Sequence, residues 1–257
     1  MSPAAAADPW IRCPIPRPAA GLRLFCLPYA GGGASLFNDW GRFLPESIEV
    51  CGIQLPGREE RIAEPAFRQA GTLLPVLLDR LGASLDRPTA FFGHSMGALI
   101  AYEASLALAA TGREPAHLIV SGQRPPHLMR PGRTSYRLSD AALCEKLRRL
   151  NGTPEAVLRE PELLNLVLPP LRCDFELAET YRRSLTARLD CPVTVLGGQD
   201  DSEVDPRALP AWQEVTRGAV EVRLFPGDHF FLKTGIEPVL ATIADALARH
   251  LRTPRGR

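Results

Sequence analysis

The sequence has no long uninterrupted apolar run, almost no net charge and no closely spaced pair of cysteines. No apolar run reaches the roughly 18 residues that a membrane-spanning helix needs, so we expect no membrane segment. Thirty Lys and Arg residues balance 29 Asp and Glu residues, a net charge of +1, which favours neither nucleic acid nor a charged membrane as a partner. Residues 1–20 are rich in Ala and Pro and lack the basic start and apolar stretch of a secretion signal. They are expected to form a flexible N-terminal arm.

The six cysteines are scattered, with no Cys-x-x-Cys pair and no Cys/His cluster at metal-ligand spacing, so we expect no metal site. Cys26 and Cys51 lie in apolar, strand-like runs, whereas Cys144 and Cys173 lie in helix-like stretches. In a chain without an export signal this setting favours free buried thiols over three disulfides, and a cytoplasmic location.

Short apolar runs alternate with longer helical patterns along the 257 residues. Strands are predicted at 22–28, 48–54, 89–93, 116–122, 192–198 and 220–227. Helices are predicted at 66–86, 97–111, 206–217 and 236–252. Because several strands are apolar on both faces, we expect an α/β fold, a mostly parallel central sheet flanked by helices, forming a single domain over residues 21–252.

The segment from about 123 to 188, here called the helical insertion, interrupts this alternation because it contains no good strand. It begins with a loop rich in Pro and Arg, and helical patterns follow from 139 and from 161. Such an insertion is typical of a lid over the ligand edge of the sheet. The alternative is a set of additional core helices without a gating role.

One pentapeptide, Gly-His-Ser-Met-Gly at 93–97, lies between a predicted strand and a predicted helix. This is the G-x-S-x-G elbow of the α/β-hydrolase fold in its expected strand–turn–helix context. The strained turn exposes the serine hydroxyl, and side chains at either glycine position would collide with neighbouring backbone. The pattern therefore predicts Ser95 as a nucleophile.

A serine nucleophile needs a histidine base and a carboxylate that orients it. Among five histidines, His229 follows the last predicted strand on a Gly-containing loop from which it could reach Ser95. The strand at 192–198 is followed by Asp200 and Asp201; we choose Asp201 as the acid and keep Asp200 as the alternative. Asp205 is expected to cap the helix that begins at Pro206.

Stabilising the oxyanion requires two backbone donors. The amide of Met96, directly after the nucleophile, is one, and the glycine-rich stretch 27–37 after an early strand supplies the other, for which we choose Ala30. A phosphate-binding loop is the alternative interpretation of these glycines, but no Gly-Lys-Ser/Thr follows them.

Taken together, the stretches LPYAGGGASLFNDW, VCGIQLPGREERIAEP, FFGHSMGALIAYE, LGGQDDSEV and GDHFFL resemble the stand-alone, type II thioesterases associated with nonribosomal peptide and polyketide synthases. The similarity extends from about Leu22 to Leu251. It implies hydrolysis of acyl thioesters held on the phosphopantetheine arm of a carrier domain, in an editing role, by an enzyme with a mobile lid. It also implies a monomer with no cofactor of its own.

Carrier domains of such systems are generally acidic around the pantetheine attachment site. Four arginines in one loop of the helical insertion are therefore candidates for carrier docking: Arg124, Arg130, Arg133 and Arg137. A solvated loop without a partner is the alternative. For the whole protein, the other hypotheses are a carboxylesterase or lipase of the same fold, and a non-catalytic binding protein that kept the fold.

Overall fold

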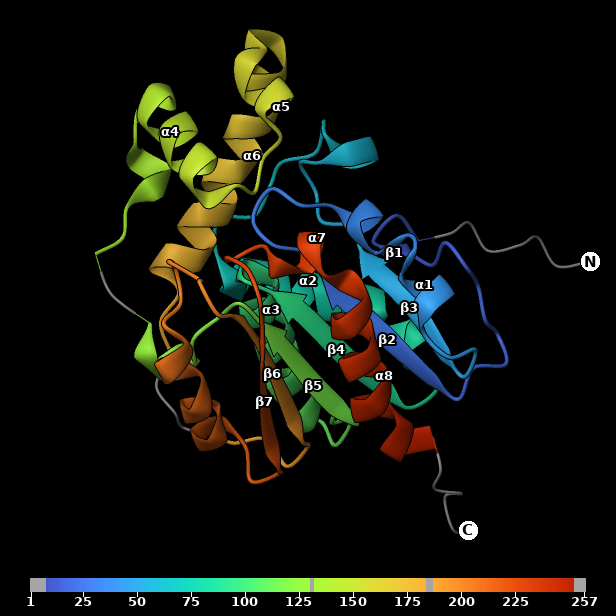
Figure 1. The fold of residues 1–257 in the computed structure, drawn as a ribbon. Helices are drawn as coiled ribbons and strands as arrows, with labels where there is room; N and C mark the ends of the chain where they lie inside the picture. Colours follow the sequence, from blue (N-terminus) through green and yellow to red (C-terminus); the bar gives the residue numbers. More distant parts are fainter. Residues whose placement is uncertain (1–7, 130–131, 184–186, 252–257) are drawn as a thin grey trace, which may run out of the picture.

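A computed structural model describes residues 8–129, 132–183 and 187–251, and its centre is a seven-stranded sheet (Figure 1). The strand order is β1-β3-β2-β4-β5-β6-β7, with β1 antiparallel to β3 and all other neighbours parallel. The strands are β1(Ile11–Arg12), β2(Leu22–Leu27), β3(Ile48–Ile53), β4(Thr89–His94), β5(His117–Ser121), β6(Val193–Gly198) and β7(Val220–Phe225). All six predicted strands are present, and the α/β class with a mostly parallel sheet is confirmed.

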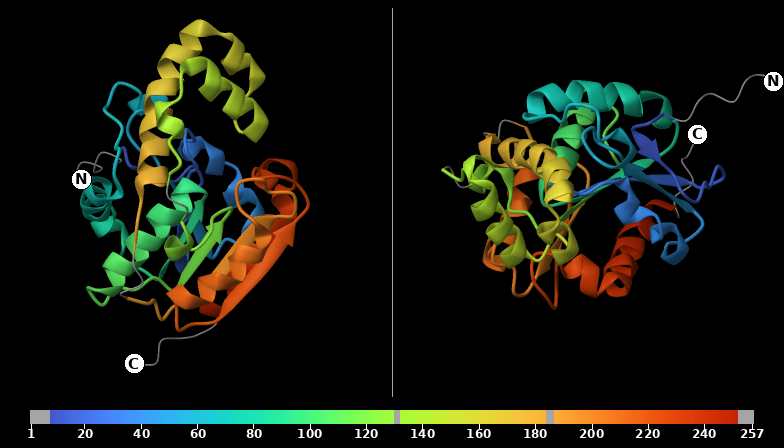
Figure 2. Two further views of the ribbon diagram at one scale, coloured as in Figure 1. Left: turned by 90° about the vertical axis from the view of Figure 1, so that its left-hand side faces the viewer. Right: turned by 90° about the horizontal axis from the view of Figure 1, so that it is seen from above.

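Helices cover both faces of the sheet (Figure 2). The helices are α1(Trp40–Phe43), α2(Ala70–Leu81), α3(Met96–Ala109), α4(Asp140–Leu150), α5(Glu155–Arg159), α6(Pro161–Thr180), α7(Phe231–Thr234) and α8(Ile236–Leu251). Apolar side chains of α2 and α3 form one core with the sheet, and those of α1 and α8 form a second core on the opposite face. Strands β3 to β6 are buried throughout, as their apolar sequences predict.

The N-terminal segment differs from expectation, because residues 8–20 are packed on the sheet and are not a flexible arm. Strand β1 pairs with β3, and Trp10 is buried in the core. This pairing brings Cys13 against Cys51, with Cα atoms 4.4 Å apart, and the two form a disulfide. The expectation of free thiols is therefore wrong for this pair, although the other four cysteines are free and buried. A strand of two residues leaves too little pattern to be predicted from the sequence.

The segment predicted as a helix at 206–217 forms the 3₁₀ helix η6(Pro206–Val215). Pro210 lies inside it and has no N–H to donate, which disfavours a regular α-helix. Asp205 caps this helix as predicted, because its Oδ1 accepts the backbone N–H of Arg207 at 2.9 Å.

The helical insertion stands above the carboxyl ends of the strands (Figures 1 and 2). Its described part contains α4, α5 and α6 and no strand, and apolar side chains of these helices form a small core of their own. Within the described ranges, no helix is long and apolar enough to cross a membrane.

Candidate active site

The strand order reverses between β2 and β4, which opens a crevice at the carboxyl ends of these two strands. The pentapeptide elbow lies at this crevice, where β4 leads into α3 through Ser95. Ser95 has φ 53° and ψ −115°, a backbone conformation that L residues rarely adopt. The sheet and α3 are packed closely enough on both sides of the turn to hold this strained residue in place.

Both elbow glycines are sterically required. A Cβ atom on Gly93 would lie 2.1 Å from the carbonyl oxygen of Gly97, and one on Gly97 would lie 2.3 Å from the carbonyl oxygen of Leu27. Neither backbone oxygen can move without shifting a strand or a helix. The predicted collision with backbone is therefore confirmed.

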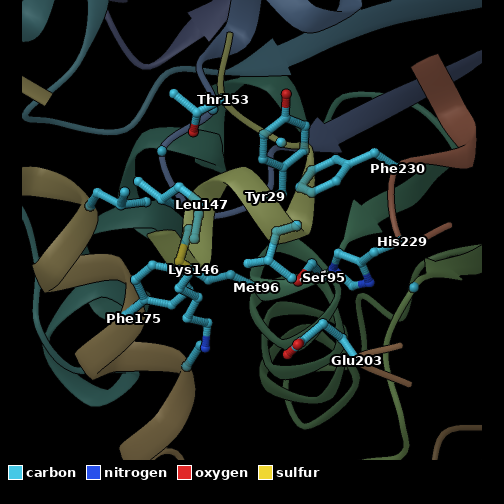
Figure 3. A pocket seen from close by; sticks show the side chains of 18 of the residues that line it. Tyr29, Ser95, Met96, Lys146, Leu147, Thr153, Phe175, Glu203, His229 and Phe230 are labelled. Atoms are coloured by element: carbon cyan, nitrogen blue, oxygen red, sulfur yellow. Dashed lines mark hydrogen bonds between the residues drawn. The ribbon is translucent and has the colours of Figure 1, made fainter. Parts of the chain in front are cut away.

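Three side chains from three strand ends meet at this edge of the sheet, and Figure 3 shows two of them, Ser95 and His229, facing each other. Nε2 of His229 lies 3.0 Å from Oγ of Ser95, and Nδ1 lies 2.8 Å from Oδ2 of Asp201. Ser95 follows β4, Asp201 follows β6 and His229 follows β7. Parallel strands present their carboxyl ends at one edge, so residues more than one hundred positions apart converge there. This arrangement can pass a proton from a hydroxyl to an imidazole held in one orientation.

The carboxylate of Asp201 is fixed by its own turn. Its side chain is 1% exposed, and Oδ1 accepts the backbone N–H groups of Glu203 and Val204 at 2.8 and 3.0 Å. Oδ2 is left to face the imidazole. Asp200, the alternative acid, is exposed, and its backbone N–H donates to the carbonyl of Gly227. Of the two neighbours, Asp201 is the one that contacts His229.

His94 lies beside this group without belonging to it. Its Nδ1 is 2.8 Å from Oγ of Ser121, and its ring centroid is 5.1 Å from that of His229. Burial holds the pKa of His94 well below its ordinary value, with a smaller contribution from the nearby His229. A neutral His94 adds no repulsion when the neighbouring imidazole takes up a proton.

A cavity of about 370 Å³ opens above Ser95, and both predicted oxyanion donors, Ala30 and Met96, line it. The helical insertion forms the wall across from His229, including Leu147 of α4 and Phe175 of α6 (Figure 3). The wall is largely apolar. A site of this kind can enclose an acyl chain next to a nucleophile.

The tip of the helical insertion touches the core beside His229. A Cβ atom on Gly152 would lie 2.4 Å from the ring of Phe230, and Nζ of Lys233 donates to the carbonyl of Gly152 at 2.6 Å. The aromatic ring of Phe230 in turn packs edge-on against His229, with centroids 5.2 Å apart. The cavity is therefore closed over His229 on this side.

Two buried charged residues lie close to the site, and the sequence pattern assigns neither of them a role. Arg58, in the stretch LPGRE, and Asp174, in α6, form an ion pair behind the loop of residues 28–33, which we call the glycine loop. Asp174 Oδ2 accepts the N–H of Gly31 at 2.7 Å. A charged residue in a conspicuous motif was the available signal for Arg58, whereas Asp174 is one carboxylate among several on its helix.

The four arginines proposed for docking have different environments. Arg124 is buried in the cavity wall and donates to the backbone carbonyl of Glu203, so the expectation that it forms part of an exposed docking surface is wrong. Arg133 is exposed and pairs with the Glu203 carboxylate, and Arg137 is exposed. Arg130 lies outside the described residues.

Comparison with known proteins identifies the relatives of this chain. The thioesterase domain family matches residues 22–247. The gramicidin S biosynthesis protein GrsT of Aneurinibacillus migulanus is 44% identical over 83% of this chain and 84% of its own length. Thioesterase PikA5 of Streptomyces venezuelae is 39% identical over 96% of this chain and 87% of its own. The structure of BorB, a type II thioesterase from the borrelidin biosynthetic cluster, superimposes with a TM-score of 0.87 at 38% identity, covering 93% of this chain and 98% of that one.

Proposed function

The chain belongs to the thioesterase domain family, and on that basis we propose that it is an editing, type II thioesterase of a nonribosomal peptide or polyketide synthase. Its substrate is an acyl group held as a thioester on the phosphopantetheine arm of a carrier domain. It acts as a monomer and without a cofactor of its own. The observation that carries the proposal is the chain of contacts from Ser95 through His229 to Asp201.

The reaction runs in two halves at Ser95. In the first, Oγ of Ser95 attacks the thioester carbonyl while Nε2 of His229 takes the hydroxyl proton, and Asp201 stabilises the resulting imidazolium. The tetrahedral intermediate collapses, the C–S bond breaks, and the pantetheine thiol leaves with the proton. In the second half His229 deprotonates a water that attacks the acyl-enzyme, which releases the carboxylic acid and restores the Ser95 hydroxyl.

The negative charge on the tetrahedral intermediate needs fixed donors. The amides of Met96 and Ala30 fill this role, since both line the cavity with Ser95 and Met96 is the first residue of α3. The helix dipole adds to the positive potential at that amide. Donors of this type contribute about 10²- to 10³-fold each in kcat.

The relatives support the carrier-bound substrate. GrsT is a gramicidin S biosynthesis protein and PikA5 is a thioesterase, and this chain matches 84% and 87% of their lengths. BorB is a type II thioesterase from the borrelidin biosynthetic cluster. The apolar cavity suits an acyl group, and its wall is built by a helical insertion that a long pantetheine arm would have to pass.

The direct test is to load a panel of acyl groups on a carrier domain and to follow release by the wild type and by Ser95→Ala. We expect hydrolysis by the wild type and a loss of at least about 10³-fold in the variant. An oxygen ester with the same acyl group serves as the matched substrate. A higher kcat/KM for the oxygen ester, or release that survives Ser95→Ala, would contradict the proposal.

Docking of the carrier is proposed to involve the two exposed arginines of the insertion loop. Arg133→Glu combined with Arg137→Glu should raise KM for a carrier-bound acyl group and leave KM for a small acyl-pantetheine thioester unchanged. Arg217→Glu is the matched control, because Arg217 is exposed just before β7, at the end of the sheet opposite Ser95. Equal effects on both substrates would exclude a docking role.

A further inference from the structure

We propose that the buried Arg58–Asp174 ion pair is a positioning device that aligns the glycine loop for oxyanion binding and ties it to the lid helix α6. The proposal rests on the proposed function, because it takes the Ala30 amide as an oxyanion donor. It assigns a role to two residues that are not part of the Ser95–His229–Asp201 contacts. The two lie 116 positions apart in the sequence.

The pair is bidentate and almost fully enclosed. Nη1 of Arg58 lies 2.7 Å from Oδ2 of Asp174, and Nη2 lies 2.9 Å from Oδ1. The side chains are 7% and 3% exposed. Taking two charges out of water is costly, and a buried ion pair is therefore weak grounds for stability alone. Its fork geometry, however, defines the position of both partners closely.

Both partners then bind the glycine loop. Oδ2 of Asp174 accepts the N–H of Gly31 at 2.7 Å, and Nη1 of Arg58 donates to the carbonyl oxygen of Gly32 at 3.2 Å. The N–H of Gly31 belongs to the peptide plane that follows Ala30. Fixing that plane leaves only the two backbone torsions of Ala30 between the Asp174 contact and the Ala30 amide, which limits the directions that this amide can take.

The lid helix also touches this loop through apolar atoms. Gly31 has φ +79°, and a Cβ atom there would lie 2.9 Å from Cδ1 of Leu171, one turn before Asp174 on α6. Without a side chain on Gly31, α6 can approach the loop closely enough for the Asp174 carboxylate to reach its N–H. The Asp174 carboxylate and the Leu171 side chain thus both contact the glycine loop at Gly31.

A second anchor secures the far end of the loop. Oε1 of Gln54 accepts the N–H of Ala34 at 2.6 Å, and its Nε2 donates to the carbonyl of Arg58 at 3.0 Å. Gln54 is fully buried. The second half of the glycine loop and the first residue after it are therefore held by Gln54 and Arg58 from the segment after β3 and by Asp174 from α6. The Arg58–Asp174 pair connects these anchoring side chains to α6 of the helical insertion.

The experiment separates positioning from stability by using a ligand that carries the oxyanion. An alkyl boronic acid forms a tetrahedral adduct with Ser95 and places a charged oxygen between the amides, whereas an acyl-pantetheine amide binds without one. Asp174→Asn keeps the side-chain volume but removes the charge. We expect it to lower kcat and boronate affinity together, by about 10- to 100-fold, less than the loss of a donor outright. KM and the affinity for the amide should stay within about twofold, as expected for a purely transition-state effect.

Arg58→Lys is the second variant, because it keeps the charge and loses the bidentate geometry. It should lower kcat and boronate affinity by a smaller factor than Asp174→Asn and leave KM and amide affinity unchanged. If Asp174→Asn does not fold, the Arg58→Lys result tests the proposal. Glu176→Gln is the matched control, because Glu176 lies on α6 like Asp174 but pairs with Arg68 at the surface and not with the glycine loop. Its kcat and its boronate affinity should equal those of the wild type.

Variants with a lower melting temperature but wild-type kcat and boronate affinity would overturn the positioning role. So would a loss of boronate affinity equal to the loss of amide affinity. Failure of the proposed function appears separately, as a wild type that does not hydrolyse carrier-bound thioesters. The boronate comparison between wild type and variant needs no turnover, so it remains decisive in that case.

Discussion

Asp201 Oδ2 lies 2.8 Å from Nδ1 of His229, while Asp200, its immediate neighbour, is exposed to solvent. Replacing Asp201 by Asn should leave the backbone turn in place but present an amide to the imidazole and favour the wrong tautomer. We expect kcat for a thioester substrate to fall by about 10⁴-fold, as in other Ser-His-Asp sites. Steady-state kinetics with an acyl-pantetheine thioester measure the change.

Asp200→Asn is the matched control, since it makes the same chemical change one residue away. Its kcat should equal that of the wild type. A comparable loss in both variants would mean that the turn as a whole, and not the contact between Asp201 and His229, is what the substitutions disturb.

Gly97→Ala should inactivate and destabilise the protein, because its Cβ would lie 2.3 Å from a backbone oxygen of β2. Overpacking of this kind typically costs about 1–3 kcal/mol, and here the backbone on both sides is part of the elbow. Gly71→Ala in α2 is the control: a Cβ there meets nothing within 4 Å, and Ala favours a helix over Gly. Urea unfolding should show a lower free energy of unfolding for Gly97→Ala and an equal or higher one for Gly71→Ala.

The sequence predicted those parts of the fold that depend on local pattern. A few neighbouring residues were enough to predict each of these features: the strands, the elbow glycines and the position of His229 after the last strand. Convergence of the strand ends then follows from the parallel topology. The sequence favoured Asp201 over Asp200 but left both open, because the path of the turn, which no local pattern specifies, decides which carboxylate faces inward.

What could not be predicted depends on contacts between distant segments. Cys13 and Cys51 meet because two residues of β1 add to the edge of β3, and a two-residue strand has no periodicity to detect. The contact of Asp174 with Gly31 joins residues 143 positions apart, and no local feature of α6 distinguishes this carboxylate from its neighbours. A contact of this second kind depends on how the helical insertion packs against the glycine loop.

The Cys13–Cys51 bridge should stabilise the protein without affecting catalysis. It closes a loop of 38 residues, and chain-entropy arguments put its effect at about 2–4 kcal/mol. Cys13→Ser should lower the free energy of unfolding by that amount while kcat stays unchanged. Thiol titration of the denatured, unreduced protein should find four free cysteines, and six after reduction. Six thiols before reduction would contradict the bridge.

His117 should make the protein sensitive to acid. It is buried between Thr194 and His250, and burial, with smaller contributions from His250 and Arg249, lowers its pKa from 6.5 to about 3. The native state keeps the imidazole neutral while the unfolded chain binds a proton. Stability is therefore lost as the pH falls from about 6.5 towards 3, by up to about 1.4 kcal/mol per pH unit.

Urea unfolding at several pH values measures this slope, and His117→Gln should make it less steep because glutamine does not titrate in that range, while the buried His94 keeps its own contribution. The variant is compared with the wild type at each pH, so a general loss of stability does not obscure the result. An unchanged slope would assign the acid sensitivity to other groups.

The tip of the helical insertion should control how firmly long acyl groups are held. A Cβ on Gly152 would lie 2.4 Å from the ring of Phe230, which is itself packed against Tyr29 and His229. We expect the loop at Gly152 to give way in Gly152→Ala, because Phe230 is buried and held on both sides. The cavity then opens, so KM should rise for an octanoyl thioester and stay unchanged for an acetyl thioester that does not reach the helical insertion.

Lys233→Met provides an independent route to the same change, since it removes the bond to the Gly152 carbonyl without adding bulk. It should raise KM for the octanoyl substrate in the same direction and by a smaller factor. If Gly152→Ala instead displaced Phe230, the imidazole of His229 would lose its packing, and kcat would fall equally for both chain lengths. The ratio of octanoyl to acetyl kcat/KM in the two variants distinguishes these results.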